Sequence, residues 1–125
     1  MYFKYKLKYD LPKEVNLSCD LPLLNSMNGT YIKLYQLING NNLYKHNELD
    51  YYFYRTMLIN NEQWIFTKNK AEISENKGNI KFIVNSLDND LETIDEYKEL
   101  DTYTHQIYYF KNNQWILTNS IIIDF

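Results

Sequence analysis

The chain contains two copies of one pattern, offset by 51 residues without a gap. Glu48-Leu49-Asp50 followed by Tyr52 recurs as Glu99-Leu100-Asp101 followed by Tyr103, and Gln63-Trp64-Ile65 recurs as Gln114-Trp115-Ile116. Both tryptophans of the chain therefore occupy equivalent positions. Because the two blocks are equally spaced in each copy, the match predicts an internal duplication, with copies over residues 28–74 and 79–125.

Each copy has the composition of β-strands joined by tight turns. In the first copy, residues 51–59 and 63–67 are rich in aromatic and aliphatic side chains, and Asn60-Asn61-Glu62 lies between them. The second copy repeats this order with residues 103–110 and 114–118. Asparagine tolerates the left-handed backbone of tight turns, so both segments predict hairpins, and Asn39-Gly40 predicts a further turn.

Residues 87–100 fit two different structures. Apolar residues recur there at three- and four-residue spacing, as on one face of an amphipathic helix: Leu87, Leu91, Ile94, Tyr97 and Leu100. The equivalent stretch of the first copy contains Asn39-Gly40, which is unfavourable inside a helix. We therefore favour a hairpin turn at residues 87–91, and a short helix is the alternative.

The first 27 residues lie outside the duplication. Residues 3–9 alternate between apolar side chains and lysines, which predicts a strand at the edge of a sheet with its lysines facing solvent. Pro12 and Pro22 then predict an extended linker or the start of an edge strand. The expected fold is one mainly β domain over residues 1–125. It would be a two-repeat antiparallel β sandwich or partly open barrel, with an N-terminal extra strand and at most one short helix.

The order of turn and aromatic residues resembles a known type of repeat. The first copy runs through Asn28-Gly29-Thr30-Tyr31, Asn39-Gly40, Tyr44-Lys45, Tyr51-Tyr52-Phe53-Tyr54 and Trp64-Ile65. This order resembles a small tandem β-repeat of eukaryotic and viral proteins. The second copy matches at Tyr108-Tyr109-Phe110 and Trp115-Ile116 and lacks the Asn-Gly step. The resemblance implies a repeat-built β module and no assigned activity.

Composition argues against several classes of function. The net charge is −3 and Arg55 is the only arginine, so we expect no nucleic-acid binding. The longest aliphatic run is three residues, 121–123, against the roughly 20 that a membrane-spanning helix needs, so we expect no membrane insertion. Lysines interrupt the N-terminal apolar residues, which excludes a typical signal peptide. Together with a single cysteine, this predicts a cytoplasmic or virion-associated protein. Abundant Asn, Lys, Ile and Tyr indicate an AT-rich genome, such as that of a virus, a parasite or a low-GC bacterium.

No residue set predicts catalysis, a cofactor or a metal site. His46 and His105 are the only histidines, and neither has ligand spacing with Cys19. The neighbours of Cys19 are leucines, which predicts a buried and inert thiol. Acidic residues within 88–99 follow the spacing of an EF-hand loop, but Thr93 stands where that loop requires glycine. We therefore expect no enzyme, no cofactor and no metal.

Tyrosine is the one positive functional signal. The chain has 13 tyrosines among its aromatic residues, and tyrosine is enriched at protein interfaces. We predict a contact patch formed by Tyr51, Tyr52, Tyr54, Tyr108 and Tyr109, and we place Trp64 and Trp115 in the core. The leading hypothesis is a non-enzymatic protein-interaction or structural module, encoded by a virus, that binds a protein partner or itself. The alternatives are a carbohydrate-binding module that stacks glycans on Tyr and Trp, and an unrecognised enzyme.

Overall fold

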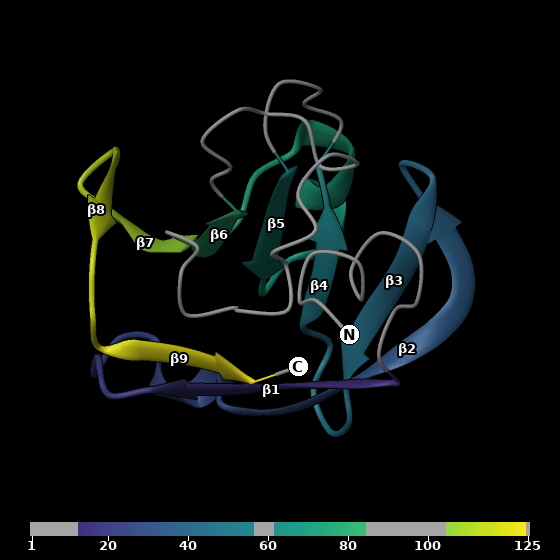
Figure 1. Ribbon diagram of the computed structural model, residues 1–125, viewed down its shortest axis with the longest axis horizontal. Coiled ribbons are helices and arrows are strands. Elements are labelled where there is room, and N and C mark those ends of the chain that lie inside the picture. Colours follow the sequence, from purple (N-terminus) through teal and green to yellow (C-terminus); the bar gives the residue numbers. More distant parts are fainter. Residues whose placement is uncertain (1–12, 57–61, 85–104, 125) are drawn as a thin grey trace, which may run out of the picture.

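The computed structural model describes residues 13–56, 62–84 and 105–124. These residues form nine strands: β1 (Glu14–Cys19), β2 (Gly29–Ile38), β3 (Asn41–His46), β4 (Tyr52–Arg55), β5 (Glu62–Thr67), β6 (Ile80–Val84), β7 (His105–Lys111), β8 (Gln114–Leu117) and β9 (Ile121–Asp124). All belong to one antiparallel sheet in the order β8-β7-β6-β5-β4-β3-β2-β1-β9. The sheet curls into a half-barrel, with β6–β8 at the left of Figure 1, β2 and β3 at the right, and β1 and β9 along the bottom. The expectation of a mainly β, partly open barrel is confirmed.

Strand β1 lies between Pro12 and Pro22, in the segment predicted to be an extended linker. Val15, Leu17 and Cys19 are buried and the residues between them are exposed, so the strand has one apolar face. β1 pairs with β2 on one side and β9 on the other, so it is an interior strand, and the prediction of an edge strand there is wrong. Pro12 and Pro22 fall outside its bounds, so every residue of β1 keeps its backbone donor. The strand predicted at residues 3–9 lies outside the described residues.

Two hairpin turns adopt the left-handed backbone expected of asparagine and glycine. Asn39 (φ 55°) and Gly40 (φ 82°) join β2 to β3, and Asn112 (φ 53°) and Asn113 (φ 60°) join β7 to β8. Positive φ at both central residues matches the twist of the flanking strands. The third predicted hairpin is also present, because β4 and β5 pair in antiparallel register, although their connection at residues 57–61 is not described.

Helical backbone in the described part of the chain is limited to two 3-10 segments, η1 (Asn25–Met27) and η2 (Lys70–Glu75). The Asn69 side chain caps η2 by accepting a hydrogen bond from the Ala71 amide at 3.0 Å. Neither segment is long or apolar enough to cross a membrane. The ambiguous stretch at residues 87–100 lies outside the described residues.

The two predicted copies share strand positions but differ in how the strands pair. β2 and β6 begin 51 residues apart, at Gly29 and Ile80. However, β3 separates β2 from β4, whereas β6 pairs directly with β7. The hairpin registers differ as well. Thr67 lies opposite Tyr52, whereas the amide of Thr118, the equivalent of Thr67, bonds the carbonyl of Ile107. The duplication itself stays a prediction from the sequence.

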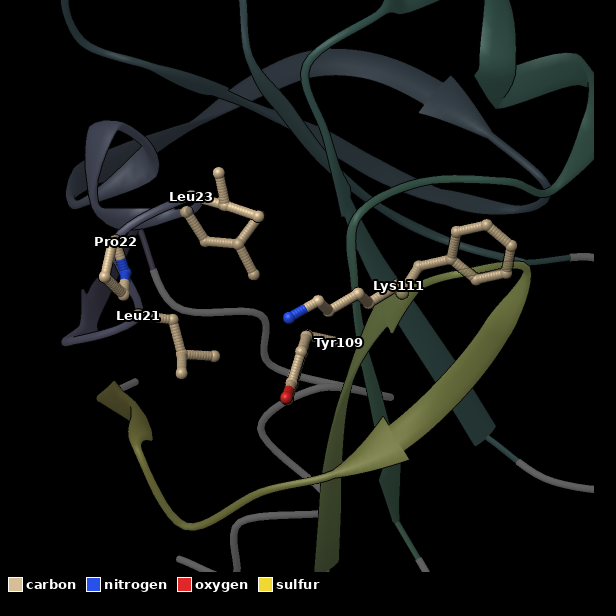
Figure 2. A pocket seen from close by; sticks show the side chains of 7 residues that line it. Leu21, Pro22, Leu23, Tyr109 and Lys111 are labelled. Atoms are coloured by element: carbon tan, nitrogen blue, oxygen red, sulfur yellow. The ribbon is translucent and has the colours of Figure 1, made fainter.

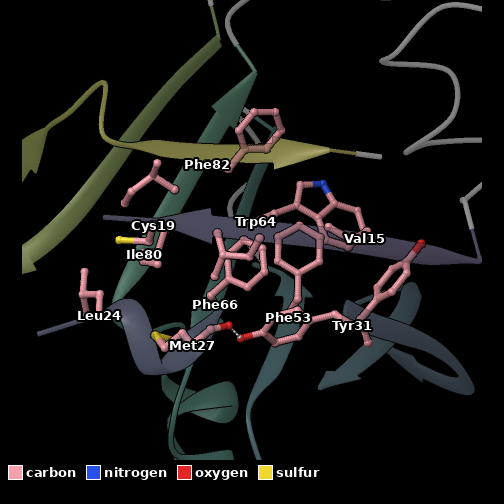
Figure 3. Packing of buried hydrophobic residues seen from close by; sticks show 13 residues of the cluster. Val15, Cys19, Leu24, Met27, Tyr31, Phe53, Trp64, Phe66, Ile80 and Phe82 are labelled. Atoms are coloured by element: carbon pink, nitrogen blue, oxygen red, sulfur yellow. Dashed lines mark hydrogen bonds between the residues drawn. The ribbon is translucent and has the colours of Figure 1, made fainter. Parts of the chain in front are cut away.

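The larger core fills the inside of the half-barrel. Its centre is an aromatic stack in which the Phe53 ring lies 5.0 Å from Trp64 and 4.1 Å from Phe66, measured between ring centroids. Figure 3 shows this stack enclosed by residues of β1, η1 and β6. The buried Tyr31 hydroxyl donates a hydrogen bond to the Met27 carbonyl at 2.8 Å, so its polar end is satisfied. The core position predicted for Trp64 is confirmed.

A smaller core covers part of the outer face of the sheet. Leu43, Tyr52, Tyr54 and Ile65 point outward from β3, β4 and β5, and Ile73 of η2 packs over them. The outer face is therefore shielded where η2 crosses it. Farther along the sheet, on β6–β8, no helical segment among the described residues covers the outer face. The candidate functional site lies on this uncovered part of the outer face.

Candidate functional site

The outer face of β6–β8 carries a group of mostly apolar side chains. Lys81 lies opposite Tyr108, Tyr108 lies opposite Leu117, and Phe110 lies opposite Trp115. Directly opposed residues in an antiparallel sheet share a face, so these five side chains lie together: Lys81, Tyr108, Phe110, Trp115 and Leu117. We call this set the Trp115 face. Phe110 is 43% exposed and Leu117 is 56% exposed, so the set is open to contact.

Lys81 and Phe110 hold the indole ring of Trp115 in place. The Lys81 ammonium lies 4.6 Å from the centroid of the Trp115 ring and 5.3 Å from that of Tyr108. The Phe110 and Trp115 centroids are 5.1 Å apart, with the rings inclined at 63°. Burial among these rings lowers the pKa of Lys81. The face is thus an ordered group of rings around one cation.

Strand β8 also presents a backbone edge with which none of the described strands pairs. Residues facing each other in an antiparallel hairpin alternate between pairs that exchange hydrogen bonds and pairs that do not. The Thr118 amide bonds the Ile107 carbonyl at 3.0 Å, so Gln114 and Ile116 also bond β7. The N–H and C=O groups of Trp115 and Leu117 consequently point away from β7. Since β8 ends the sheet, no described strand pairs with them.

The opposite end of the sheet, β9, has a different character. The Asp20 amide bonds the Ser120 carbonyl at 3.2 Å, so by the same alternation Ile121 and Ile123 direct their backbone groups outward. Their side chains, however, belong to or pack against the inner core. Ile122 is the exposed apolar residue of this strand. β9 therefore offers a backbone edge with little apolar surface beside it.

An apolar pocket adjoins the Trp115 face at Phe110. It has a volume of about 200 Å³ and lies between residues 21–24 and residues 109–111 of β7. Figure 2 shows Leu21, Pro22 and Leu23 on one side, with Tyr109 and the extended Lys111 side chain on the other. We call it the Leu23 pocket.

The structure separates the five tyrosines predicted to form one contact patch. Tyr52 and Tyr54 are buried beneath η2, and the Tyr54 hydroxyl donates a hydrogen bond to the Lys77 carbonyl at 2.7 Å. Tyr51 is half-buried and packs against His46, and Tyr109 packs against the inner core. Only Tyr108 lies on the Trp115 face. Tyr52 and Tyr54 therefore belong to the interior, because a segment distant in sequence covers them.

Sequence reasoning missed most of the Trp115 face. Lys81, Phe110 and Leu117 were not singled out, and Trp115 was placed in the core by analogy with Trp64. That placement is wrong, because β8 is an edge strand and leaves Trp115 half-buried. The available signal was alternation, since Tyr108 and Phe110 fall on one face of β7, and Trp115 and Leu117 on one face of β8.

His46 has a structural role. Its Nδ1 accepts hydrogen bonds from the amides of Glu48 and Leu49, at 3.0 and 3.1 Å. Its Nε2 lies 2.8 Å from the Asn28 carbonyl and therefore carries the proton. Both ring nitrogens are satisfied by backbone groups, so His46 fixes the loop after β3. The side chain of His105 lies outside the described part of the chain.

The described residues contain no cluster of three or more His, Cys, Asp or Glu side chains that could hold a metal ion. Cys19 is buried, as predicted, and its burial raises the pKa of the thiol, which disfavours the reactive thiolate. The Asn28 side chain bonds both the amide and the carbonyl of Cys19, at 2.6 and 3.1 Å, so the cysteine lies in a tightly bonded strand end.

Comparison with known proteins adds no further assignment. No protein-family model, curated protein or solved structure matches the chain. The functional proposal therefore depends on the geometry of the Trp115 face, the β8 edge and the Leu23 pocket.

Proposed function

We propose that the protein is a non-enzymatic interaction module that associates with a second copy of itself through β8. The observation that carries this proposal is the coincidence of two features on one four-residue strand. The backbone groups of Trp115 and Leu117 point to an edge with which no described strand pairs, and the side chains of the same residues belong to the exposed Trp115 face.

Strand β8 lacks most features that protect edge strands from pairing. Residues 114–117 are Gln, Trp, Ile and Leu, with no proline, charge or bulge. Short length is the one protective feature that β8 has. A contact of this length buries less than the roughly 1,600 Å² of a standard interface, so the association is weak and depends on concentration.

Antiparallel pairing of two β8 strands satisfies the outward groups of both copies. In the register that places Ile116 opposite Ile116 of the second copy, Trp115 lies opposite Leu117 of the second copy, and the reverse. Both residues direct their backbone groups to the edge, so each of these pairs exchanges two hydrogen bonds. A two-fold axis relates the copies, and the two Trp115 faces become one continuous surface. Such an interface closes as a dimer.

The carbohydrate alternative receives less support from the geometry of Trp115. Stacking with a sugar needs an open face of the aromatic ring. The Lys81 ammonium lies over the Trp115 ring, so a glycan stacking on that face of the ring would have to displace a cation–π contact. Leu117, the most exposed residue of the Trp115 face, is aliphatic and suits an apolar protein contact better.

The experiment is light scattering after size exclusion, over a wide range of protein concentration. We expect the mass of the wild type to rise from monomer toward dimer. Leu117→Lys places a charge at the edge of β8 and should hold the protein at monomer mass across that range. Leu37→Lys is the matched control, because Leu37 is a 67% exposed strand leucine on β2. This variant should dimerise as the wild type does.

Three results would count against the proposal. If the wild type stays monomeric at every concentration, the protein does not self-associate. If Leu117→Lys dimerises as the wild type does, the interface does not involve β8. A mass that grows beyond the dimer indicates head-to-tail contact, in which β8 of one copy pairs with β9 of the next.

A further inference from the structure

The Leu23 pocket has the size and lining of a site for a small apolar molecule. Its volume is about 200 Å³, and four of its lining residues are Leu21, Pro22, Leu23 and Leu24. An apolar cavity of about 150 Å³ is large enough for benzene. The pocket therefore has room for one aromatic ring and a short polar substituent.

The leucine wall of the pocket is held by backbone hydrogen bonds. The amides of Leu24 and Asn25 both donate to the Leu21 carbonyl at 2.9 Å, which closes a tight turn. The Lys68 ammonium donates to the Leu23 carbonyl at 3.3 Å and ties this turn to β5. A wall fixed in this way is formed before a ligand binds, which lowers the entropic cost of binding.

The opposite wall supplies two hydrogen-bond donors. Figure 2 shows the Lys111 side chain extending from β7 toward the leucines, above the Tyr109 side chain. Within the described part of the chain, neither the Lys111 ammonium nor the Tyr109 hydroxyl has a hydrogen-bond or ion-pair partner. None of the described residues that line the pocket is acidic. Apolar walls with an ammonium and a hydroxyl complement a ligand with an apolar body and an anionic end.

We propose that the Leu23 pocket binds small aromatic carboxylates, with the ring against Leu21 and Leu23 and the carboxylate at Lys111. This site is distinct from the β8 edge, and it does not depend on self-association. Phe110 lines the pocket, and its ring packs against Trp115 on the outer face.

The test is a titration of the full chain with phenylacetate, followed by NMR of backbone amides and leucine methyl groups. A probe of about ten non-hydrogen atoms in an open pocket should bind with a Kd of about 1 mM. We expect saturable shifts at Leu23, Leu24 and Lys111. Phenylacetamide, which has the same ring and no charge, should bind at least fivefold more weakly.

Two variants and one control variant connect the effect to the pocket. Lys111→Met should weaken phenylacetate at least fivefold and leave phenylacetamide unchanged. Lys77→Met removes another exposed lysine, near η2, and should change neither. Leu23→Glu, at a residue that is 72% exposed and tolerant of change, should weaken phenylacetate by charge repulsion.

The proposal is overturned if phenylacetate produces no saturable shifts at the pocket, or if shifts spread over all lysines in proportion to exposure. Equal loss of both probes in Lys111→Met also overturns it, because the carboxylate would then not contact the ammonium. Repeating the titration in Leu117→Lys separates the two proposals. Failure of dimerisation should leave the phenylacetate shifts intact, and failure of phenylacetate binding leaves the dimer unaffected.

Discussion

Replacement of the two tryptophans by alanine should have very different effects on stability, although their sequence contexts are equivalent. Trp64 is fully buried, stacks on Phe53 and contacts Tyr44. Removing a buried tryptophan of this kind costs about 3–5 kcal/mol, because both apolar burial and ring contacts are lost. For a small domain this is a large share of the total free energy of unfolding.

Trp115 is half-buried on an edge strand, so its removal loses mainly two contacts. The Phe110 ring contact is worth about 0.5–1.5 kcal/mol and the Lys81 cation–π contact about 0.5–1 kcal/mol. Trp115→Ala should therefore cost about 1–2.5 kcal/mol. The measurement is urea unfolding followed by far-ultraviolet circular dichroism, at a concentration where the protein is monomeric. Equal losses for the two variants, or a larger loss for Trp115→Ala, would refute the assignment of interior and edge positions.

Two further predictions concern the free energy of unfolding, one its dependence on pH and the other the effect of replacing glycines. Burial raises the pKa of Tyr31, Tyr44 and Tyr54 well above the ordinary value of about 10, so above pH about 10 the unfolded chain releases protons that the folded chain keeps. The free energy of unfolding should fall there by up to about 4 kcal/mol per pH unit, and a flat profile from urea titrations between about pH 8 and 11.5 would contradict it. Gly29→Ala should destabilise by at least about 2 kcal/mol, because Gly29 has φ 137° and a Cβ there would lie 2.5 Å from His46 Nε2. Gly40→Ala, with φ 82° and no atom within 4 Å of its Cβ, should lose less in the same unfolding assay.

The strands and turns could be predicted because their causes are local. The asparagine turns at residues 39–40 and 112–113 depend on neighbouring residues alone. Strand β1 was not among the predicted strands, because Pro12 and Pro22 marked its segment as a linker. The position of Trp64 beside a predicted hairpin also placed it correctly in the core, but the same argument placed Trp115 there wrongly. These features predicted the mainly β class and left a sandwich and a partly open barrel as alternatives, of which the structure has the second.

The candidate site depended on contacts between distant segments. Every residue of Tyr51-Tyr52-Phe53-Tyr54 is aromatic, so the alternation of apolar and polar residues could not separate the core face of this strand from its outer face. The sequence pattern also could not show that η2 covers the rings on the outer face. The position of Trp115 was set by strand order, because β5 lies inside the sheet and β8 ends it. The duplication predicted that Trp64 and Trp115 are equally buried. Their burial differs because it depends on which strands pair with β5 and β8.

The most direct test of the self-association is hydrogen exchange at single β8 amides. The amides of Gln114 and Ile116 bond β7 and should be protected at every protein concentration. The amides of Trp115 and Leu117 should exchange rapidly in dilute protein and become protected as the protein concentration rises. In the Leu117→Lys variant, the Trp115 amide should stay unprotected at every concentration. Rapid exchange of both outward amides at concentrations where the wild type has dimer mass would contradict pairing through β8.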